Sequence, residues 1–267
     1  MSEKPPEPRL RLRRGVPVLR RAQGRLQVGM DPARRLLLPD TPSVDAFLSG
    51  LTAGTEEPED PELQDVVARL RSRRLLVDRL EVRHRRLARA ETRVRLWGSP
   101  TGLCREVAQL LLAQGLTLLA PGDGAPADVT VLLSVGEPAR DLVDDLTHPG
   151  DPVLLVAVID ARVRLGPFVL PGVTACLRCL DAHQALMDPG VPAPPDPRLP
   201  RAVEVSELLL RDVALRTAVD VVAWAEGRCP RTWSATTWLD EDLVEEHEAW
   251  LRHPHCGCGW DELIGAG

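Results

Sequence analysis

The sequence predicts an α/β protein built from two units, and three features lead to this prediction. Residues 1–90 contain 19 lysines and arginines against 13 aspartates and glutamates, whereas residues 91–267 have a net charge of −12. From residue 93 onward the pattern runs strand, glycine-containing turn, amphipathic helix, strand, which is typical of a βαβ unit. Two cysteine pairs also stand about 80 residues apart near the end of the chain. We therefore divide the chain at about residue 90.

Composition sets the broad class of protein. The chain has 267 residues, of which 44% are hydrophobic and 27% are charged, as in soluble globular proteins. No apolar run approaches the roughly 20 residues of a membrane-spanning helix, and the start, MSEKPPEPRLRLRR, lacks the apolar segment of a signal peptide. We expect a cytoplasmic protein without membrane contact, in which six cysteines serve as metal ligands or buried thiols rather than as disulfides.

The first unit, residues 1–90, is predicted to be a small winged-helix-like module. Three short β-type segments are followed by a helix that begins at Thr41 or Ser43 and ends at Gly50. A second helix places its apolar residues on one face, and residues 75–78 form a last strand. The β-type segments span 16–21, 25–30 and 34–39, and the apolar helix positions are Leu63, Val66, Val67 and Leu70. An ordinary α+β domain with a solvated arginine face remains the alternative interpretation.

An excess of arginine makes nucleic-acid binding worth testing against the sequence. A basic module of winged-helix shape would suit DNA. However, basic and acidic residues alternate through the segment 81–96, and Phe47 is the one aromatic residue of the first 90 available for stacking on bases. We therefore expect no nucleic-acid partner.

The second unit, residues 91–267, begins with a turn that resembles a nucleotide-binding turn. Gly98 and Gly102 stand where such a turn has glycines, but Pro100 replaces the middle one and has no N–H for a phosphate. After the next strand, Asp123 is the one nearby acidic residue that could bind a ribose. We interpret the turn as a remnant and predict no catalytic residues. The apolar runs 128–135 and 152–160 predict buried strands in a sheet with about four parallel strands.

The two cysteine pairs predict a metal site. Residues 161–172 are expected to form a hairpin around Gly166-Pro167 that leads to Cys176 and Cys179, and the second pair is Cys256 and Cys258. Four thiolates from two short chelating turns match a closed tetrahedral zinc site, which leaves no open position for catalysis. We predict structural Zn²⁺. Unligated thiols, a redox pair, or His253 or His255 in place of a cysteine are the alternatives.

The remaining candidates have weaker signals. Cys104 is expected to be a core thiol and Cys229 an unpaired one. Five of the six tryptophans follow residue 220, and they belong to the core unless several are exposed, in which case they would mark a protein-binding surface.

Two stretches resemble a known family. These are LGPFVLPGVTACLRCLDAH (165–183) with HPHCGC (253–258), and RGVPVLRRAQGRLQVGMDPARRLLLPDTPSVDAFLSGL (14–51). They resemble the ThiF-like (ubiquitin-activating-enzyme-like) partner proteins of thiazole/oxazole-modified peptide biosynthesis, also described as precursor leader-peptide-binding proteins or cyclodehydratase partners. The resemblance spans nearly the whole chain.

The resemblance implies a fold and a function. It implies a winged-helix-like peptide-recognition module followed by a reduced ThiF-like Rossmann-type domain with a four-cysteine zinc site. The loop GSPTGLC and the segment LLAPGDGAPAD depart from the adenylating members of the family, which favours the branch without ATP chemistry. We therefore expect a non-catalytic scaffold, active only as an accessory subunit, that binds the leader of a ribosomally made precursor peptide. It would present that peptide to a YcaO-type cyclodehydratase for azoline formation, as in bacteriocin biosynthesis.

The resemblance also assigns a peptide groove to the third N-terminal strand and the helix from Leu63 to Arg74, by addition of a strand to a sheet edge. The expected peptide-binding residues are Arg34, Arg35, Leu36, Leu37, Leu38, Val66, Arg69 and Arg73. The rival function is an ATP-dependent adenylyltransferase, acting on a peptide or carrier protein, that uses Gly98, Gly102 and Asp123. A homodimer is left open.

Overall fold

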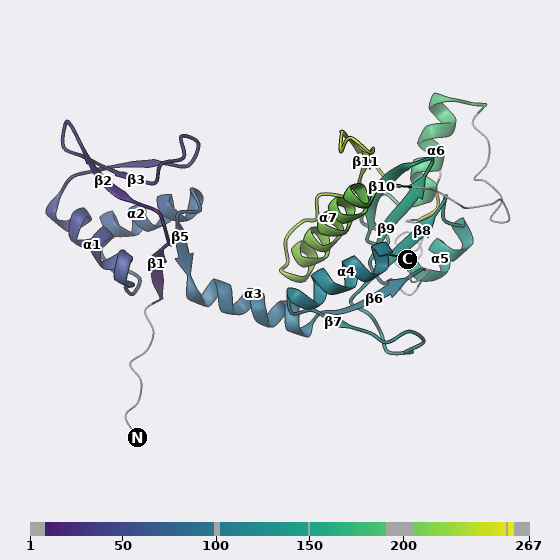
Figure 1. The fold of residues 1–267 in the computed structure, drawn as a ribbon, viewed down its shortest axis with the longest axis horizontal. Helices are drawn as coiled ribbons and strands as arrows, with labels where there is room; N and C mark the ends of the chain where they lie inside the picture. Colours follow the sequence, from purple (N-terminus) through teal and green to yellow (C-terminus); the bar gives the residue numbers. More distant parts are fainter. Residues whose placement is uncertain (1–8, 99–101, 149, 191–204, 255, 259–267) are drawn as a thin grey trace, which may run out of the picture. The chain divides into compact units, whose positions relative to one another are not determined.

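The computed structural model describes residues 9–98, 102–148, 150–190, 205–254 and 256–258. The chain forms two compact units, Met1–Arg86 and Leu87–Gly267 (Figure 1). Each unit has a hydrophobic core of its own, so we describe the two separately. None of the helices in the described ranges is both long enough and apolar enough to span a membrane.

Unit 1 combines a three-stranded antiparallel sheet in the order β2-β3-β4 with a two-stranded pair, β1-β5, and two helices. Leucine and valine side chains from all of these elements except β2 form the buried core, and Val18 of β2 packs against it. The elements are β1 (Leu10–Leu12), β2 (Val18–Arg21), β3 (Arg25–Val28), β4 (Leu36–Pro39), α1 (Pro42–Ala53), α2 (Pro61–Ser72) and β5 (Leu76–Asp78).

Both helices of unit 1 begin where their sequences provide a cap. Thr41 accepts a hydrogen bond from Val44 N–H at the start of α1, and Asp60 accepts one from Glu62 N–H at the start of α2. Each helix has proline in its first turn, where the missing N–H costs no intrahelical hydrogen bond. Capping residue and proline together fix these helix starts locally.

A buried carboxylate, that of Asp78, connects several segments of unit 1. Asp78 lies at the end of β5 and accepts hydrogen bonds from the guanidinium groups of Arg9 and Arg71 at 3.2 and 2.8 Å. Its other oxygen accepts from Leu80 N–H and so caps α3 (Arg79–Glu91). The two arginines outweigh the effect of burial and hold the pKa of Asp78 below its usual value.

Unit 2 is built on a seven-stranded mixed sheet in the order β12-β11-β10-β9-β8-β6-β7. Strands β7, β6, β8 and β9 are parallel, in agreement with the four predicted, and β10, β11 and β12 continue the sheet in antiparallel fashion. The strands are β6 (Arg93–Trp97), β7 (Thr117–Leu118), β8 (Val129–Val135), β9 (Val153–Ile159), β10 (Arg162–Val169), β11 (Ala235–Leu239) and β12 (Glu245–Ala249).

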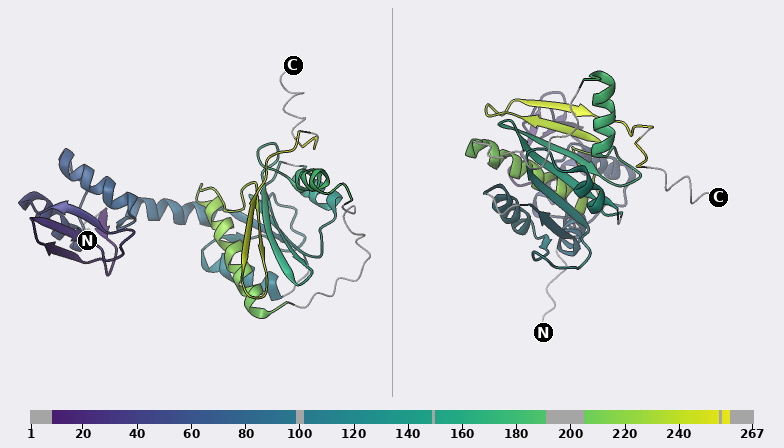
Figure 2. Two further views of the ribbon diagram at one scale, coloured as in Figure 1. Left: turned by 90° about the horizontal axis from the view of Figure 1, so that it is seen from above. Right: turned by 90° about the vertical axis from the view of Figure 1, so that its right-hand side faces the viewer.

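Helices cover both faces of this sheet (Figure 2). Alternate strand residues divide between two cores, since Val131 packs beneath α4 and α7 whereas Leu132 packs with α5 and α6. The helices are α4 (Gly102–Ala113), α5 (Arg140–Thr147), α6 (Leu177–Met187) and α7 (Glu207–Ala225). Because α6 starts directly after Cys176, the first cysteine pair lies on the α5/α6 face.

The expected hairpin around Gly166-Pro167 is wrong in its position. The turn lies at Asp160 and Ala161, both with positive φ, and Gly166 and Pro167 lie inside β10, where the pairing with β9 shifts. A Cβ on Gly166 would meet the carbonyl oxygen of Ala235 at 2.4 Å, so the glycine permits the close approach of β11.

Candidate metal centre and open sheet edge

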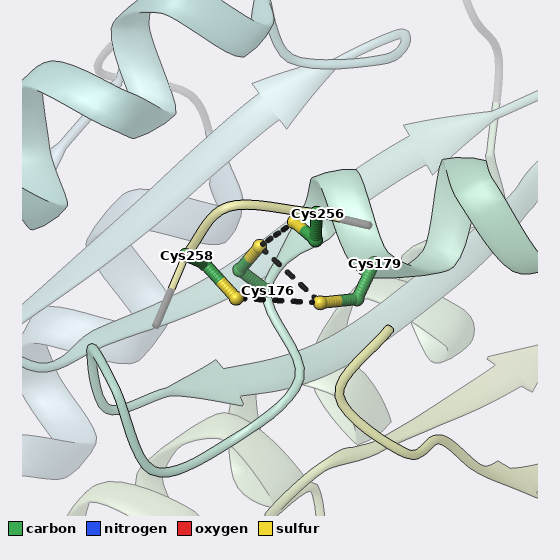
Figure 3. Close-up of side chains that lie close together, drawn as sticks. All are labelled: Cys176, Cys179, Cys256 and Cys258. Carbon is green, nitrogen blue, oxygen red and sulfur yellow. Dashed lines mark hydrogen bonds between the residues drawn. The ribbon is translucent and has the colours of Figure 1, made fainter. Parts of the chain in front are cut away.

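The four predicted ligand cysteines lie together. Their sulfur atoms are all within 4.8 Å of one another, and they point toward a common centre (Figure 3). The distances from Cys176 Sγ to Cys256 Sγ and from Cys179 Sγ to Cys258 Sγ are 3.4 and 3.5 Å. Two of these cysteines belong to the start of α6 and two to the C-terminal segment, so the cluster joins residues 77 or more positions apart.

The spacing of the sulfur atoms fits a metal ion with tetrahedral coordination. With Zn–S bonds of about 2.3 Å, the edges of a ZnS₄ tetrahedron are about 3.8 Å long. Cys176 Sγ and Cys179 Sγ lie 3.7 Å apart, and none of the cysteines takes part in a disulfide. Gly257, between the last two ligands, has φ +76°, a conformation that glycine adopts without strain. The donor set is therefore compatible with a metal site of zinc type.

Neighbouring groups favour a thiolate in the cluster. The Cys176 thiol donates to Cys179 Sγ and the backbone N–H of His253 donates to the same sulfur at 3.3 Å. Both contacts lower the pKa of Cys179, to about 4. Burial raises the pKa of Cys256, to about 12. A cation at the centre would favour the thiolate form of each sulfur.

Histidines lie close to the cluster without sharing its centre. His183 Nε2 lies 2.9 Å from the carbonyl oxygen of Leu251, and its ring contacts those of Trp250 and His253. His255, the other histidine considered as a ligand, lies outside the described residues.

The turn after β6 packs tightly against the sheet. Gly98 has φ +144°, and a Cβ there would lie 2.2 Å from the carbonyl oxygen of Leu133, whereas a Cβ on Gly102 would meet nothing within 4 Å. Pro100 lies outside the described residues. The carboxylate of Asp123 accepts a hydrogen bond from Ala125 N–H within its own loop. The structure thus uses Gly98 for packing and Asp123 for a local turn.

Beyond the end of β8, the structure places an ion-pair cluster that the sequence analysis missed. The carboxylate of Glu137 accepts hydrogen bonds from Arg164 Nη1 and Nη2 at 2.6 and 3.0 Å, and a third from Arg140 at 2.9 Å. Arg140 also binds Asp181 of α6 at 2.6 and 2.7 Å. Arg164 is only 4% exposed. An arginine between the apolar residues Val163 and Leu165 of β10 is the signal that could have indicated it.

The peptide-binding residues predicted in unit 1 fall into two groups. Leu36, Leu38 and Val66 are buried in the core of unit 1. Of the other five, four are exposed, Leu37 to 37%, and Arg69 is half-buried, and they lie along the outer edge of β4. They are Arg34, Arg35, Leu37, Arg69 and Arg73.

The backbone N–H and C=O of Leu37 point away from β3, toward the outer edge of the sheet. Asp40 N–H donates to Gly24 carbonyl, and strand alternation from that pair makes Leu38 and Leu36 the residues bonded to β3. Leu37 therefore directs its N–H and C=O to the open edge. On the same edge Pro39 has no N–H, and the N–H of Arg35 donates to the carbonyl of Asp31. Leu37 is thus the position of β4 where both backbone groups face outward and the N–H is uncommitted among the described residues.

Two arginines of the α2 segment reach this edge. Arg69 Nη2 donates to the carbonyl of Leu37 at 3.0 Å, and Arg73 Nη1 donates to the carbonyl of Ala33 at 2.9 Å. Arg69 Nη1 lies 3.6 Å from the carboxylate of Asp65, an exposed contact of small energetic weight.

The fold and the cysteine cluster together define an α/β protein with a mixed seven-stranded sheet, a four-thiol site and a small N-terminal unit. No family model matches the sequence, and no curated protein matches it. Solved structures do match. A heterocyclase in complex with substrate and cofactor has a TM-score of 0.69 at 15% identity over 96% of this chain and 40% of its own.

Two further solved structures have a similar fold. The heterocyclase TruD has a TM-score of 0.68 at 17% identity over 96% of this chain and 43% of its own. MccB of E. coli with ATP has a TM-score of 0.64 at 12% identity over 94% of this chain and 99% of its own. This chain spans about two fifths of each heterocyclase. The expected resemblance is therefore confirmed at the level of the fold, which this chain shares with the heterocyclases and with MccB.

Proposed function

We propose that this protein is a scaffold that binds the leader of a ribosomally made precursor peptide and presents the peptide to a YcaO-type cyclodehydratase. In this proposal unit 1 is a winged-helix-like recognition module, and unit 2 is a reduced ThiF-like domain of Rossmann type. The observation that carries it is the outer edge of β4. That edge presents backbone hydrogen-bonding groups beside exposed arginines, which suits an extended peptide with acidic residues.

Fold similarity supports the same proposal. A heterocyclase solved with its substrate and cofactor, and E. coli MccB solved with MccA, both match across more than nine tenths of this chain. The match includes unit 1 as well as unit 2, because unit 2 alone is about two thirds of the chain. A peptide-handling role therefore accounts for both units.

The contacts beyond the carboxyl ends of β6, β7 and β8 favour a scaffold over catalysis. Asp123 binds within its own loop, Gly98 packs on Leu133, and two arginines neutralise Glu137. The metal would be structural Zn²⁺ held by the four cysteines, which joins the C-terminal segment to the start of α6.

The test is an affinity capture from the native host with the full chain and with its Leu37→Pro variant. We expect the full chain to retain a small precursor-type peptide and a YcaO-type enzyme, and the variant to lose the peptide. Capture of the enzyme without any peptide, or of a peptide equally by both baits, would contradict the proposal.

An adenylyltransferase is the second candidate, since the ATP-bound E. coli MccB matches over 99% of its own length. Pyrophosphate exchange driven by candidate peptides, and lost in Asp123→Asn, would support that activity in place of the scaffold.

A further inference from the structure

Arg69 occupies the hydrogen-bonding position that an incoming strand would need. A strand that adds to the edge of β4 must donate an N–H to the carbonyl of Leu37 and accept one from the N–H of Leu37. The carbonyl oxygen of Leu37 already accepts a hydrogen bond from Arg69 Nη2 at 3.0 Å. Because Arg69 takes one of the two lone pairs of that oxygen, an incoming strand must compete with Arg69 for the carbonyl or displace it.

If an incoming peptide strand displaces Arg69, the charged guanidinium is left beside that strand. The guanidinium has lost its bond to Leu37, and its remaining described neighbour, Asp65, is exposed and lies at 3.6 Å. A carboxylate on the incoming peptide would restore two charge-assisted hydrogen bonds in fork geometry. A peptide without such a group would leave Arg69 to solvent.

We propose that Arg69 makes the edge of β4 selective for acidic peptides: it covers the carbonyl of Leu37, and only a peptide that offers a carboxylate near Leu37 compensates for its removal. This inference rests on the proposed function and names the specificity of its site. Arg73 differs, because it binds the carbonyl of Ala33, which precedes β4. It contributes positive charge but covers no group that the peptide needs.

The probe is a fluorescein-labelled 12-residue peptide selected from a displayed random library on the full chain, together with its version in which every Asp and Glu is replaced by Asn and Gln. Binding is measured by fluorescence anisotropy on the wild type, Arg69→Ala, Arg73→Ala and Leu37→Pro. Proline at position 37 removes the outward N–H without breaking a hydrogen bond to β3, and Pro39 already stands two residues further along the same edge. Val18→Pro is its control on the opposite edge of the sheet. There the bond from Gly29 N–H to Pro17 carbonyl shows that Val18 faces outward.

The expected result is a change of opposite sign for the two peptides. Arg69→Ala weakens binding of the acidic peptide about fivefold and strengthens binding of the amide version about threefold, because the carbonyl of Leu37 is then open. Arg73→Ala weakens the acidic peptide and leaves the amide version unchanged. Leu37→Pro lowers the affinity for both, and Val18→Pro for neither, with folding checked by circular dichroism.

The outcomes distinguish a failure of the proposed function from a failure of the role of Arg69. Selected peptides that bind Leu37→Pro as well as wild type overturn the proposed function at this edge. Peptides that need Leu37, but whose two versions respond to Arg69→Ala in the same direction, leave the function standing and overturn the role of Arg69. A selection that returns no acidic peptide also overturns the selectivity.

Discussion

At the scale of single residues, the four cysteines of the cluster are the part of the molecule that motif spacing located. The spacing Cys-x-x-Cys and Cys-x-Cys places two sulfur atoms near one point from each local turn, and the structure brings the two turns together. The sequence alone could not show that the histidines next to the cluster have other partners, because the bond from His183 to Leu251 depends on how the C-terminal segment lies on α6.

Replacement of one cluster cysteine is expected to remove the metal. Cys258→Ser should lower the bound zinc from about one ion per chain to near zero and destabilise unit 2, because three thiolates bind zinc far less tightly than four. Elemental analysis and thermal unfolding would measure both effects. Cys229→Ser is the matched control, since its thiol is exposed and outside the cluster, and an equal effect there would contradict the assignment.

Glu137 is expected to make the stability of unit 2 depend on pH. Burial opposes its charge, but Arg164 and Arg140 outweigh burial and hold its pKa below the usual value. Its contribution is therefore fully present above the pKa of the unfolded chain, about 4.3, and is lost as the pH falls through the lower pKa of the folded state.

The variant Glu137→Gln should accordingly be less stable than wild type by about 3 kcal/mol at pH 7, because it leaves Arg164 buried without a charged partner. The difference should shrink as the pH falls from about 5 to 3. Urea unfolding across that range measures it. Glu246→Gln removes an exposed ion pair with Arg162 and should show little change at any pH.

At the scale of elements, most helices and the parallel strands follow from local pattern. The start of α2 at Pro61 after the Asp60 cap, and the apolar runs of β8 and β9, lie close to where the sequence predicts them. Strands β11 and β12 were not predicted. All five residues of β12, EEHEA, are exposed, and the strand exists because it pairs with β11 along its whole length. Such a strand has no periodicity to detect.

The two glycines at the turn after β6 are expected to differ sharply. Gly98→Ala should destabilise the protein by about 3 kcal/mol, because a Cβ meets the Leu133 carbonyl oxygen at 2.2 Å and φ is +144°. Gly102→Ala should change stability by no more than about 0.5 kcal/mol, since nothing lies within 4 Å and the residue begins α4. Chemical denaturation of both variants checks this, and equal effects would mean that the turn tolerates side chains.

At the scale of the whole molecule, two separate cores predict two unfolding events. Leu38 is fully buried in the core of unit 1, whereas the cysteine cluster lies against a core of unit 2. Leu38→Ala should lower the stability of unit 1 by about 2–5 kcal/mol and leave the transition of unit 2 in place, and Cys258→Ser should do the reverse. Differential scanning calorimetry distinguishes the two transitions. A single transition shifted equally by both variants would contradict independent units.

The sequence by itself determined the α/β class, the four parallel strands and the four thiols, because strand and helix periodicity and short chelating turns act over a few residues. The tertiary structure alone decided which leucine side chains of β4 are buried and which leucine has backbone groups that face outward. Leu36 and Leu38 looked like groove residues in sequence, yet their side chains are buried, and the backbone of Leu37 between them faces outward. It also decided that Arg69 reaches Leu37 and that Arg164 meets Glu137. These are contacts between residues more than 25 positions apart, and no local pattern encodes them.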